Sequence, residues 1–293
     1  MASIENGAVL VTGASTGIGR ATALHLDAGG YRVFAGVRRD EDGASVRAAC
    51  SDRLTPVIID VTDRDSIVAA RERAEETVGE GGLAGLVNNA GIANAGPVEH
   101  LPVEEFQRVL DVNLTGQYAV TQEFLPLIRR GEGTIVFITS IGGLIASPFM
   151  SPYHAAKFGV EGLADSLRRE LKPWQIDVVV IEPGSIATPI WEKGTATFEA
   201  QQPAMGPDLE RLYGKQMEAM KAAIVDTAER GIEPDRVAKV IERAIASRKP
   251  KTRYLVGVDA KLMRRISRLI GDRNFDRLMR RSMKLPGERP PGS

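Results

Sequence analysis

The sequence is poor in the residues that form disulfides and bind metals. Its 293 residues include one cysteine, Cys50, and three histidines. A single cysteine excludes an intramolecular disulfide and is typical of a reducing compartment, so we expect a cytoplasmic protein. Three scattered histidines and one cysteine do not suit a zinc site, and we expect no bound metal.

The chain also lacks a net charge and long apolar runs. Its 38 Lys and Arg balance 38 Asp and Glu, so nothing global points to a nucleic-acid partner. No cationic stretch followed by an apolar core opens the chain, which argues against a signal peptide. No apolar run reaches the roughly 18 residues that a spanning helix needs. With 43% hydrophobic and 26% charged residues, the composition is that of a globular protein.

What is present is an alternation of short β-branched runs with helical patterns. Seven runs are apolar on both faces, as buried parallel strands must be, and they lie at 8–13, 32–37, 55–61, 85–91, 134–140, 177–184 and 253–258. Helical patterns lie between them, near 17–29, 63–79, 103–130, 152–172 and 234–247. The alternation predicts an α/β fold, a doubly wound seven-stranded parallel sheet in a single domain of residues 1–258.

Two segments interrupt the alternation. Residues 185–231 follow the sixth predicted strand with a helical pattern and no strand of their own. Ligands bind outside the carboxyl ends of the strands in such sheets, so we expect this insertion to cover a substrate. Residues 259–285 form a basic amphipathic extension, and we expect the polar residues 286–293 to be disordered.

The extension is compatible with two roles. Between 261 and 285 it carries nine Lys and Arg against two Asp. Apolar residues recur beside these cations at helical spacing: Leu262, Ile266, Leu269, Ile270, Phe275, Leu278 and Met279. Such a helix either lies on an anionic lipid surface, as a peripheral membrane contact, or packs on its own domain or a partner subunit. The sequence leaves both roles open.

The glycine-rich stretch "TGASTGIG", residues 12–19, joins the first predicted strand to the first helix. A turn in this place presents backbone N–H groups and the positive end of a helix dipole to an anion. Gly13 permits the tight turn, while Gly17 and Gly19 let a pyrophosphate and the neighbouring strand approach. The spacing G-x-x-x-G-x-G differs from the general dinucleotide fingerprint, but its position predicts the same kind of site.

The second predicted strand ends in "GVRRD", residues 36–40, without the acid that usually binds the ribose of NAD. Val37 stands at the position of that acid, and Arg38 follows it. An arginine suits the 2′-phosphate of NADP(H), although a solvated surface turn would carry the same residues. The sequence therefore favours NADP(H) and still allows NAD(H).

Tyr153 and Lys157 lie four residues apart, so a helix would place the phenol and the ammonium on one face. Ser140 precedes them, at the end of the fifth predicted strand. Reduction of a carbonyl needs a proton donor at its oxygen, and the reverse oxidation needs a base at the same place. A cation about 5 Å away favours a phenolate by about 3 kcal/mol at an effective dielectric of about 20. We therefore expect Lys157 to lower the pKa of Tyr153.

Six motifs stand in a consistent order: "TGASTGIG", "NNAG" (88–91), "VN" (112–113), Ser140, Tyr153-x-x-x-Lys157 and "PG" (183–184). From residue 8 to near residue 190 the chain resembles a classical short-chain dehydrogenase/reductase (SDR). The stretches "VFAGVRR", "DSLRRELKPWQIDVVVIEPG" and "TRYLVGVDAKL" resemble its retinol and 17β-hydroxysteroid dehydrogenase branch. The resemblance implies a Rossmann fold and an NAD(P)-dependent oxidoreductase of class EC 1.1.1.-, acting on a carbonyl or alcohol.

The resemblance also implies residue roles. Tyr153 is the catalytic acid/base, Ser140 bonds the substrate oxygen, Lys157 binds the nicotinamide ribose, and Asn113 holds a water for proton relay. The implied cofactor positions are Gly13, Ser15, Thr16, Gly17, Ile18, Gly19, Arg38, Asp60, Val61, Asn89, Ala90, Gly91, Tyr153, Lys157, Pro183, Gly184, Ile186 and Thr188. Asn89 is equally compatible with a structural tie between strands. His154 would point about 100° away from Tyr153 on a helix, and we expect a structural role for it.

Three expectations concern partners and alternatives. The predicted pocket is mainly apolar, so we expect a small lipophilic substrate that is a retinoid, steroid, fatty carbonyl or xenobiotic; its residues are Leu144, Met150, Ile186, Trp191 and parts of 195–225. Helices near 103–130 and 152–172 carry surplus apolar residues and pair across a two-fold axis in the family, which predicts a homodimer or homotetramer. The alternative function is a non-catalytic dinucleotide-binding redox sensor or regulator, which would not need all four catalytic positions.

Overall fold

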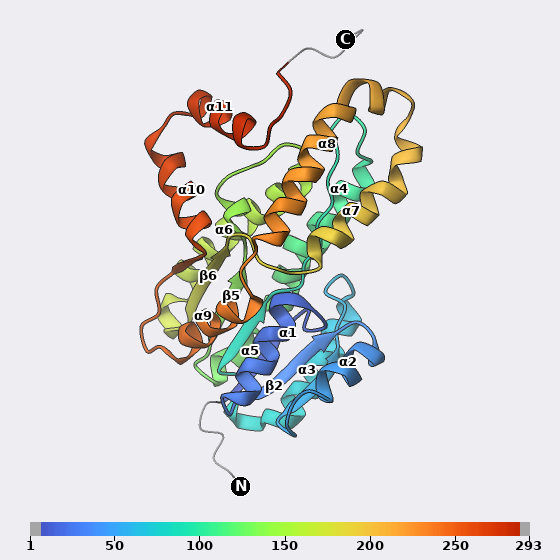
Figure 1. The fold of residues 1–293 in the computed structure, drawn as a ribbon. Coiled ribbons are helices and arrows are strands. Elements are labelled where there is room, and N and C mark those ends of the chain that lie inside the picture. Colours follow the sequence, from blue (N-terminus) through green and yellow to red (C-terminus); the bar gives the residue numbers. More distant parts are fainter. Residues whose placement is uncertain (1–6, 288–293) are drawn as a thin grey trace.

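A computed structural model describes residues 7–287, and within them seven parallel strands form one sheet (Figure 1). The order across the sheet is β3-β2-β1-β4-β5-β6-β7. The strands are β1 Ala8–Val11, β2 Arg32–Val37, β3 Leu54–Ile58, β4 Gly85–Asn88, β5 Thr134–Ile138, β6 Asp177–Pro183 and β7 Arg253–Val256. All seven predicted strands and the doubly wound Rossmann topology are confirmed. The strand order reverses between β1 and β4, which creates a topological switch point at their carboxyl ends.

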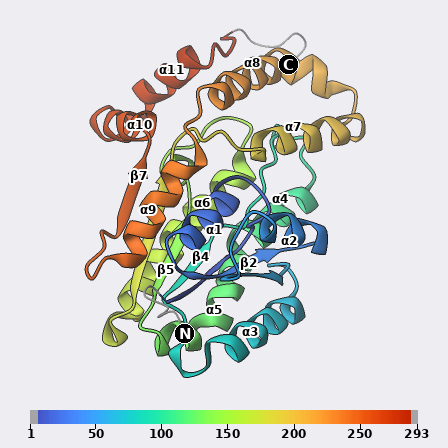
Figure 2. The same cartoon turned by 60° about the horizontal axis from the view of Figure 1, so that its bottom comes forward.

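Helices cover both faces of the sheet (Figure 2). Helices α1 (Gly17–Ala28), α2 (Asp40–Arg47) and α9 (Pro234–Ala246) pack where Val9 and Val11 of β1 point. Helices α3 (Arg64–Val78), α5 (Gly116–Arg130) and α6 (Ser151–Glu170) pack on the opposite face, where Ala8 and Leu10 point. Successive side chains of a strand thus enter two apolar clusters, which is why the strands are apolar on both faces.

The structure differs from the sequence prediction in two helical regions. The single helix expected at 103–130 consists of α4 (Val103–Leu110), a π-helical turn (Asp111–Thr115) and α5. Helix α2 was not predicted, because it is only eight residues long, most of them are polar and one is a glycine. Its first turn carries three acidic residues, which stabilise the amino end of a helix.

Most strands end earlier than their apolar patterns predict. The regular strands end at Val11, Asn88 and Ile138, although Thr12, Thr139 and Ser140 beyond them are still buried. Thr12, for example, is 1% exposed; its backbone N–H donates to Val87 of β4, and its hydroxyl accepts from the N–H of Asn89, just after β4. Of the residues just past the strand ends, Asn89, Thr139 and Ser140 line a cavity at the carboxyl edge of the sheet.

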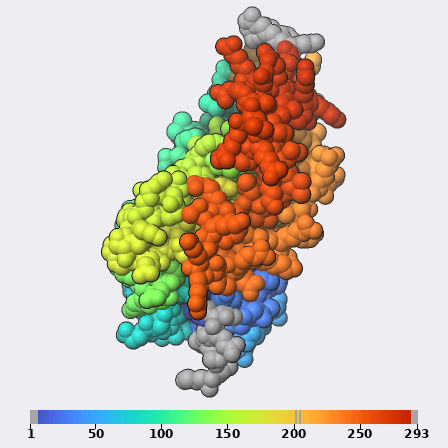
Figure 3. Space-filling model, turned by 90° about the vertical axis from the view of Figure 1, so that its left-hand side faces the viewer, coloured from blue at the N-terminus to red at the C-terminus, as the bar shows by residue number. Residues whose placement is uncertain are grey.

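The insertion after β6 contains two helices, α7 (Ile190–Gln201) and α8 (Asp208–Glu229), joined through the 3₁₀ turn Gln202–Met205. Figures 1 and 2 show both helices standing at the carboxyl edge of the sheet. The extension forms α10 (Val258–Leu269) and α11 (Asp272–Ser282), which occupy the upper part of the face in Figure 3. The expected disorder of 286–293 concerns residues that, from 288 onward, lie outside the described part of the chain.

Candidate active site

A cavity lies at the carboxyl ends of the strands, on the switch point between β1 and β4. It collects nearly all of the site residues that the sequence predicted, although they are spread from residue 13 to residue 188. Those that line it are Gly13, Ser15, Thr16, Gly17, Ile18, Arg38, Asp60, Val61, Asn89, Ala90, Gly91, Ser140, Tyr153, Lys157, Pro183, Gly184, Ile186 and Thr188. Gly19 and Asn113 are not among the residues that line the cavity and lie behind them.

The glycine loop forms a cradle that side chains would fill. Gly13 and Gly17 have φ values of +64° and +56°, a backbone region that favours glycine. A Cβ on Gly17 would lie 3.1 Å from Thr188 Cγ2, and one on Gly19 would lie 2.2 Å from the carbonyl oxygen of Gly13. No side-chain hydrogen bond caps α1 at Thr16. The first N–H groups of α1 therefore suit an anion, and the loop fits a dinucleotide pyrophosphate.

The floor of the cradle is tied together by Thr12 and Asn89. The hydroxyl oxygen of Thr12 accepts from the backbone N–H groups of Asn89 and Ala90, each at 3.0 Å. The side-chain amide of Asn89 donates to the carbonyl of Thr12 at 2.9 Å. Asn89 thus links β1 to β4 in addition to lining the cavity. Thr12 was missed from the sequence, where a threonine before a glycine carries no distinctive signal.

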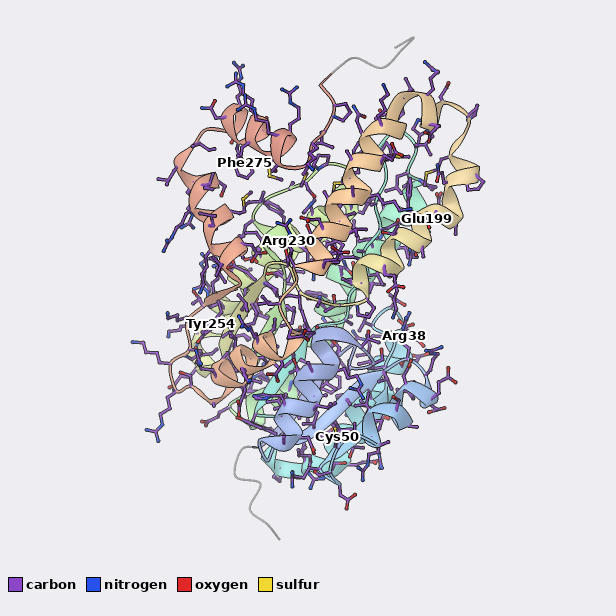
Figure 4. The ribbon with its side chains drawn as sticks, in the orientation of Figure 1. Arg38, Cys50, Glu199, Arg230, Tyr254 and Phe275 are labelled. Atoms are coloured by element: carbon purple, nitrogen blue, oxygen red, sulfur yellow. The ribbon has the colours of Figure 1, made fainter. Side chains whose placement is uncertain are left out.

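Arg38 and Arg39 differ in their partners. Arg39 is held by Asp42 at 2.9 Å and by Glu41 at 3.0 Å. Arg38 lines the cavity and makes no ion pair among residues 7–287. Lys193 of α7 lines the same cavity, and the charges of Arg38 and Lys193 both act on Asp42 of α2. In Figure 4 Arg38 lies on the edge of the sheet that faces the insertion.

Asp60 lies just beyond β3, close to Arg38. Its carboxylate accepts from the backbone N–H of Thr62 at 2.9 Å and from the Thr62 hydroxyl at 2.7 Å. Partial burial by itself would raise the pKa of Asp60. The hydrogen bonds from Thr62 and the charge of Arg38 outweigh it, so the pKa lies below its ordinary value. Asp60 is therefore a charged hydrogen-bond acceptor at the rim of the cavity.

Ser140, Tyr153 and Lys157 come together where β5 ends and α6 begins. The side chain of Ser140 accepts from the N–H of Gly142 at 3.0 Å and lies close enough to the phenol of Tyr153 to act on its pKa. Lys157 donates to the carbonyl of Ile138 at 2.8 Å, and its Nζ lies 5.7 Å from the centre of the Tyr153 ring. Tyr153 and Lys157 are 5% and 4% exposed. A buried hydroxyl pair beside a buried amine can pass a proton to an oxygen held in the cavity.

The pKa of Tyr153 departs from the expectation based on its spacing from Lys157. Burial raises the pKa of the phenol above 10, and the hydrogen bond with Ser140 opposes that rise only in part. Burial also lowers the pKa of Lys157 to about 8, against the opposing charge of Glu161. The distance between Tyr153 and Lys157 is as expected, but the loss of water around the phenol shifts its pKa more than the charge of Lys157 does. In this cavity Tyr153 is therefore a neutral phenol at pH 7.

Asn113 occupies the π-helical turn and is fully buried. Its side-chain oxygen accepts from the N–H of Ile92 at 2.8 Å, and its side-chain nitrogen donates to the carbonyl of Ile92 at 2.8 Å. Both ends of the amide are thus used to hold the segment after β4. The side chain fixes the cavity wall that contains Ala90 and Gly91.

The ring of His154 makes three hydrogen bonds that hold the loop after Ser140, one to Gly142 and two to Ser147. Nδ1 bonds the carbonyl of Gly142 at 2.8 Å, and Nε2 accepts from the N–H of Ser147 at 2.9 Å. These partners require a neutral ring with its proton on Nδ1, and burial lowers the pKa of His154 accordingly. The structural role expected for His154 is confirmed.

An apolar cluster surrounds the phenol of Tyr153. Its buried members are Ala93, Met150, Tyr153 and Met220, and Ala95, Phe149, Ile190, Trp191, Ile224 and Met283 pack against them. Met150, Trp191 and the α8 residues agree with the predicted pocket. Met283 follows α11 and was missed, because nothing in the sequence indicates that the extension returns to the cavity. The cluster makes the space beside Tyr153 apolar.

Comparisons with known proteins agree with this geometry. The chain matches the family model for short chain dehydrogenases over residues 7–198. It is 37% identical over 268 residues to retinol dehydrogenase 5 of Mus musculus, covering 87% of this chain and 82% of that protein. It is 32% identical over 280 residues to the NADPH-dependent 3-dehydrocapnine reductase of Ornithobacterium rhinotracheale, covering 94% and 96%. A short-chain dehydrogenase structure from Streptomyces avermitilis matches with a TM-score of 0.75 and 27% identity over 97% of both chains.

The chain belongs to the short-chain dehydrogenase family, in its retinol and 17β-hydroxysteroid dehydrogenase branch, and it is an NAD(P)-dependent oxidoreductase. Within residues 7–287 no helix is long and apolar enough to cross a bilayer. The same residues contain no group of His, Cys, Asp and Glu side chains that could hold a metal ion.

Proposed function

We propose that this protein reduces the carbonyl group of a lipophilic substrate with NADPH, with Tyr153 as the proton donor. The observation that carries this proposal is the buried pair of Ser140 and Tyr153, which lies beside Lys157 in the cavity that holds the glycine cradle. The reverse oxidation uses the same residues. A non-catalytic dinucleotide sensor is the competing function, and it would have no use for this buried proton donor.

The cofactor would be held by residues along the whole cavity. The cradle of Gly13, Gly17 and Gly19 suits the pyrophosphate, and Asp60 suits the adenine amino group. Arg38 suits a 2′-phosphate, since it has no carboxylate partner among the described residues and shares the cavity with Lys193. When bound, the dinucleotide supplies or accepts a hydride equivalent at the substrate carbon. We propose a preference for NADP(H), with NAD(H) as a weaker cofactor.

The chain's own residues would perform the proton chemistry. Ser140 and Tyr153 both donate hydrogen bonds to the substrate oxygen, which polarises the carbonyl and orients it in the cavity. As negative charge develops on that oxygen, the phenol of Tyr153 gives up its proton. The positive charge of Lys157 stabilises the phenolate that remains, and Asn113 keeps the adjoining wall in place. A water relay behind Lys157 would return the proton.

The neutral state of Tyr153 favours the reductive direction. Burial raises the pKa of the phenol further above pH 7, so the acid form needed for reduction is already present. Oxidation of an alcohol would first require removal of this proton. The relative from Ornithobacterium is named as an NADPH-dependent reductase, which supports the same direction.

The substrate would be lipophilic because the cluster around Tyr153 is apolar. Burial of apolar substrate surface against Met150, Trp191 and Met220 provides affinity of about 25 cal/mol per Å². We infer a retinoid-, steroid- or fatty-carbonyl-like compound. The insertion at 185–231 would cover it, within a catalytic domain of residues 1–258.

Turnover with a panel of aldehydes, ketones and steroids tests the function. We expect NADPH oxidation with at least one lipophilic carbonyl and a KM that falls with chain length. NADPH binding without turnover on any member of the panel would favour the sensor instead.

Two features of the surface suggest how the protein assembles and where it acts. Tyr118 of α5 and Phe158 of α6 are 51% and 46% exposed on neighbouring helices, which suits the interface of a homodimer or homotetramer. Light scattering at micromolar concentration should show more than a monomer.

In the extension Leu262 and Leu269 are 55% and 83% exposed among many arginines, which suits peripheral contact of a cytoplasmic protein with anionic lipid. Co-sedimentation with phosphatidylserine vesicles should be salt-sensitive, and absence of binding at low salt would exclude the contact.

A further inference from the structure

A cluster of charged side chains lies behind the active site and has no role in the proposed reaction. Glu161 of α6 and Glu182 of β6 have side chains that are 10% and 2% exposed. Arg253 of β7 lies between them and is 33% exposed. Carboxylates are seldom buried to this extent without a partner or a function. The cluster joins α6, the helix that carries Tyr153 and Lys157, to β6 and β7.

Both oxygens of Glu161 are engaged. Oε1 accepts from the hydroxyl of Thr139 at 2.8 Å, and Oε2 accepts from Nε of Arg253 at 3.1 Å. A second nitrogen of Arg253 lies 3.0 Å from the same carboxylate and 3.0 Å from Asp165. Burial raises the pKa of Glu161, while the hydrogen bonds from Thr139 and the charge of Arg253 oppose that rise. The guanidinium thus favours the charged carboxylate and holds it in one orientation.

Glu182 is held less completely. Arg253 Nε lies 3.3 Å from Oε1 of Glu182, but that oxygen accepts no hydrogen bond within the described residues. The charges of Arg264 and Arg268 from α10 also act on Glu182. Arg253 thus separates two carboxylates that would otherwise repel each other, and Glu161 receives its better-formed contacts.

Glu161 is close to Lys157 along the helix and through the strand. The two residues lie four apart on α6, so they share one face. Lys157 donates to the carbonyl of Ile138, while Glu161 accepts from the hydroxyl of the next residue, Thr139. Ser140 follows directly. One carboxylate therefore acts on the catalytic amine and on the end of β5 that presents the catalytic hydroxyl.

We propose that Glu161, held in place by Arg253, is a positioning residue that keeps Lys157 protonated and fixes the end of β5 beneath Ser140. Lys157 is buried, so its charge needs a nearby counter-charge, and Glu161 supplies it. The groups that face this pair are Tyr153 and Asp165 on α6, Glu182 on β6, Arg253 on β7 and Arg264 on α10. The catalytic contribution of Glu161 rests on the proposed function, but its effect on the charge of Lys157 does not.

The test is a titration of Lys157 in the full chain. Lysine labelled with ¹³C and ¹⁵N reports the protonation of each amine by NMR, and Lys157→Arg assigns the signal. In Glu161→Gln, which keeps the shape and the acceptor for Thr139, we expect the midpoint of Lys157 to fall by about one pH unit. The alkaline limb of kcat/KM should move down by the same amount, with kcat near pH 6.5 within about threefold of the wild type.

Asp165→Asn is the matched control. It removes another partner of Arg253 but lies one turn further from Lys157, so it should leave the midpoint unchanged. Arg253→Gln is a second variant, in which Glu161 loses its cation and takes up a proton, and it should shift the midpoint in the same direction as Glu161→Gln. An unchanged midpoint in either folded variant overturns the proposal, as does an equal shift in Asp165→Asn. A shifted midpoint in a protein without turnover would retain the proposal and refute the proposed function.

Discussion

The side-chain amide of Asn113 pairs with the backbone of Ile92 at both of its ends, each at 2.8 Å. This pairing joins the π-helical turn between α4 and α5 to the segment after β4 that lines the cavity. An asparagine is needed because the pairing uses one donor and one acceptor on the same planar group. Asn113 therefore shapes the cofactor wall from outside the cavity.

Replacement of Asn113 by Leu should weaken folding and cofactor binding together. It would leave the N–H and the carbonyl of the partly buried Ile92 without their present partner, at a cost of about 1–3 kcal/mol in the free energy of unfolding. Denaturant unfolding and NADPH titration measure the two effects. Gln122→Leu is the control, because Gln122 is an exposed amide that bonds Arg64 at 3.0 Å. Normal stability and NADPH affinity in Asn113→Leu would contradict this role.

Tyr153→Phe should lose turnover and keep its cofactor. Removal of the phenolic oxygen takes away the proton donor, which we expect to reduce kcat about a thousandfold. Fluorescence titration with NADPH should be near normal, since the aromatic ring and Lys157 remain. A variant with more than roughly a tenth of the wild-type turnover would exclude Tyr153 as the acid.

Arg38→Ala should reduce the preference for NADP(H). Charge-assisted hydrogen bonds to a 2′-phosphate contribute about 1.5–3 kcal/mol, so the wild type should prefer NADPH over NADH about ten- to a hundredfold in kcat/KM. Arg39→Ala is the matched control, since Arg39 is already paired with Asp42 and Glu41. The prediction fails if the wild type prefers NADH, or if both variants change the ratio equally.

Glu182→Gln should remove a dependence of stability on pH. Burial, with the nearby charge of Glu161, raises the pKa of Glu182 from 4.5 to about 7, while Arg253, Arg264 and Arg268 oppose the rise. The folded state therefore binds more protons than the unfolded state between these two values. The stabilising contribution is complete below about pH 4.5 and is lost as the pH rises through about 7.

At pH 8 we expect Glu182→Gln to be more stable than the wild type by about 1–3 kcal/mol, with the difference vanishing near pH 5. Thermal melts at both pH values measure this. The exposed Glu104 on α4 provides the control substitution Glu104→Gln. A pH dependence that is the same in Glu182→Gln and the wild type would contradict the assignment.

Met283→Ala should change substrate selection more than catalysis. Met283 packs against the cluster around Tyr153, so its loss removes apolar contact from the far side of the cavity. KM for a long-chain carbonyl should rise about tenfold, and kcat/KM for a small carbonyl should stay unchanged. Met279→Ala is the control, because Met279 lies four residues earlier, in the last turn of α11. Equal effects of the two variants on KM would show that the extension acts without a specific contact at Met283.

Much of this protein was determined by patterns that are local in the sequence. Strands apolar on both faces require a sheet covered by helices on both sides, and the glycine loop at the first strand end requires an anion site there. The separation of Tyr153 and Lys157 is one helical turn, so their shared face followed from spacing alone. The cavity at the carboxyl edge followed from parallel topology, because the ends of parallel strands meet at one edge.

Only the tertiary structure decided the contacts between distant segments and the effect of burial. Glu161 and Arg253 are 92 positions apart, and no periodicity relates them. The same is true of Met283 in the cluster around Tyr153, and of Arg38, which makes no ion pair among residues 7–287, beside the paired Arg39. The sequence predicted a lowered pKa for Tyr153, and the structure gives a raised one. The spacing of the two residues gives the distance from Tyr153 to Lys157 but not the loss of water around the phenol. Desolvation depends on everything packed around a group, and that packing exists only in the folded chain.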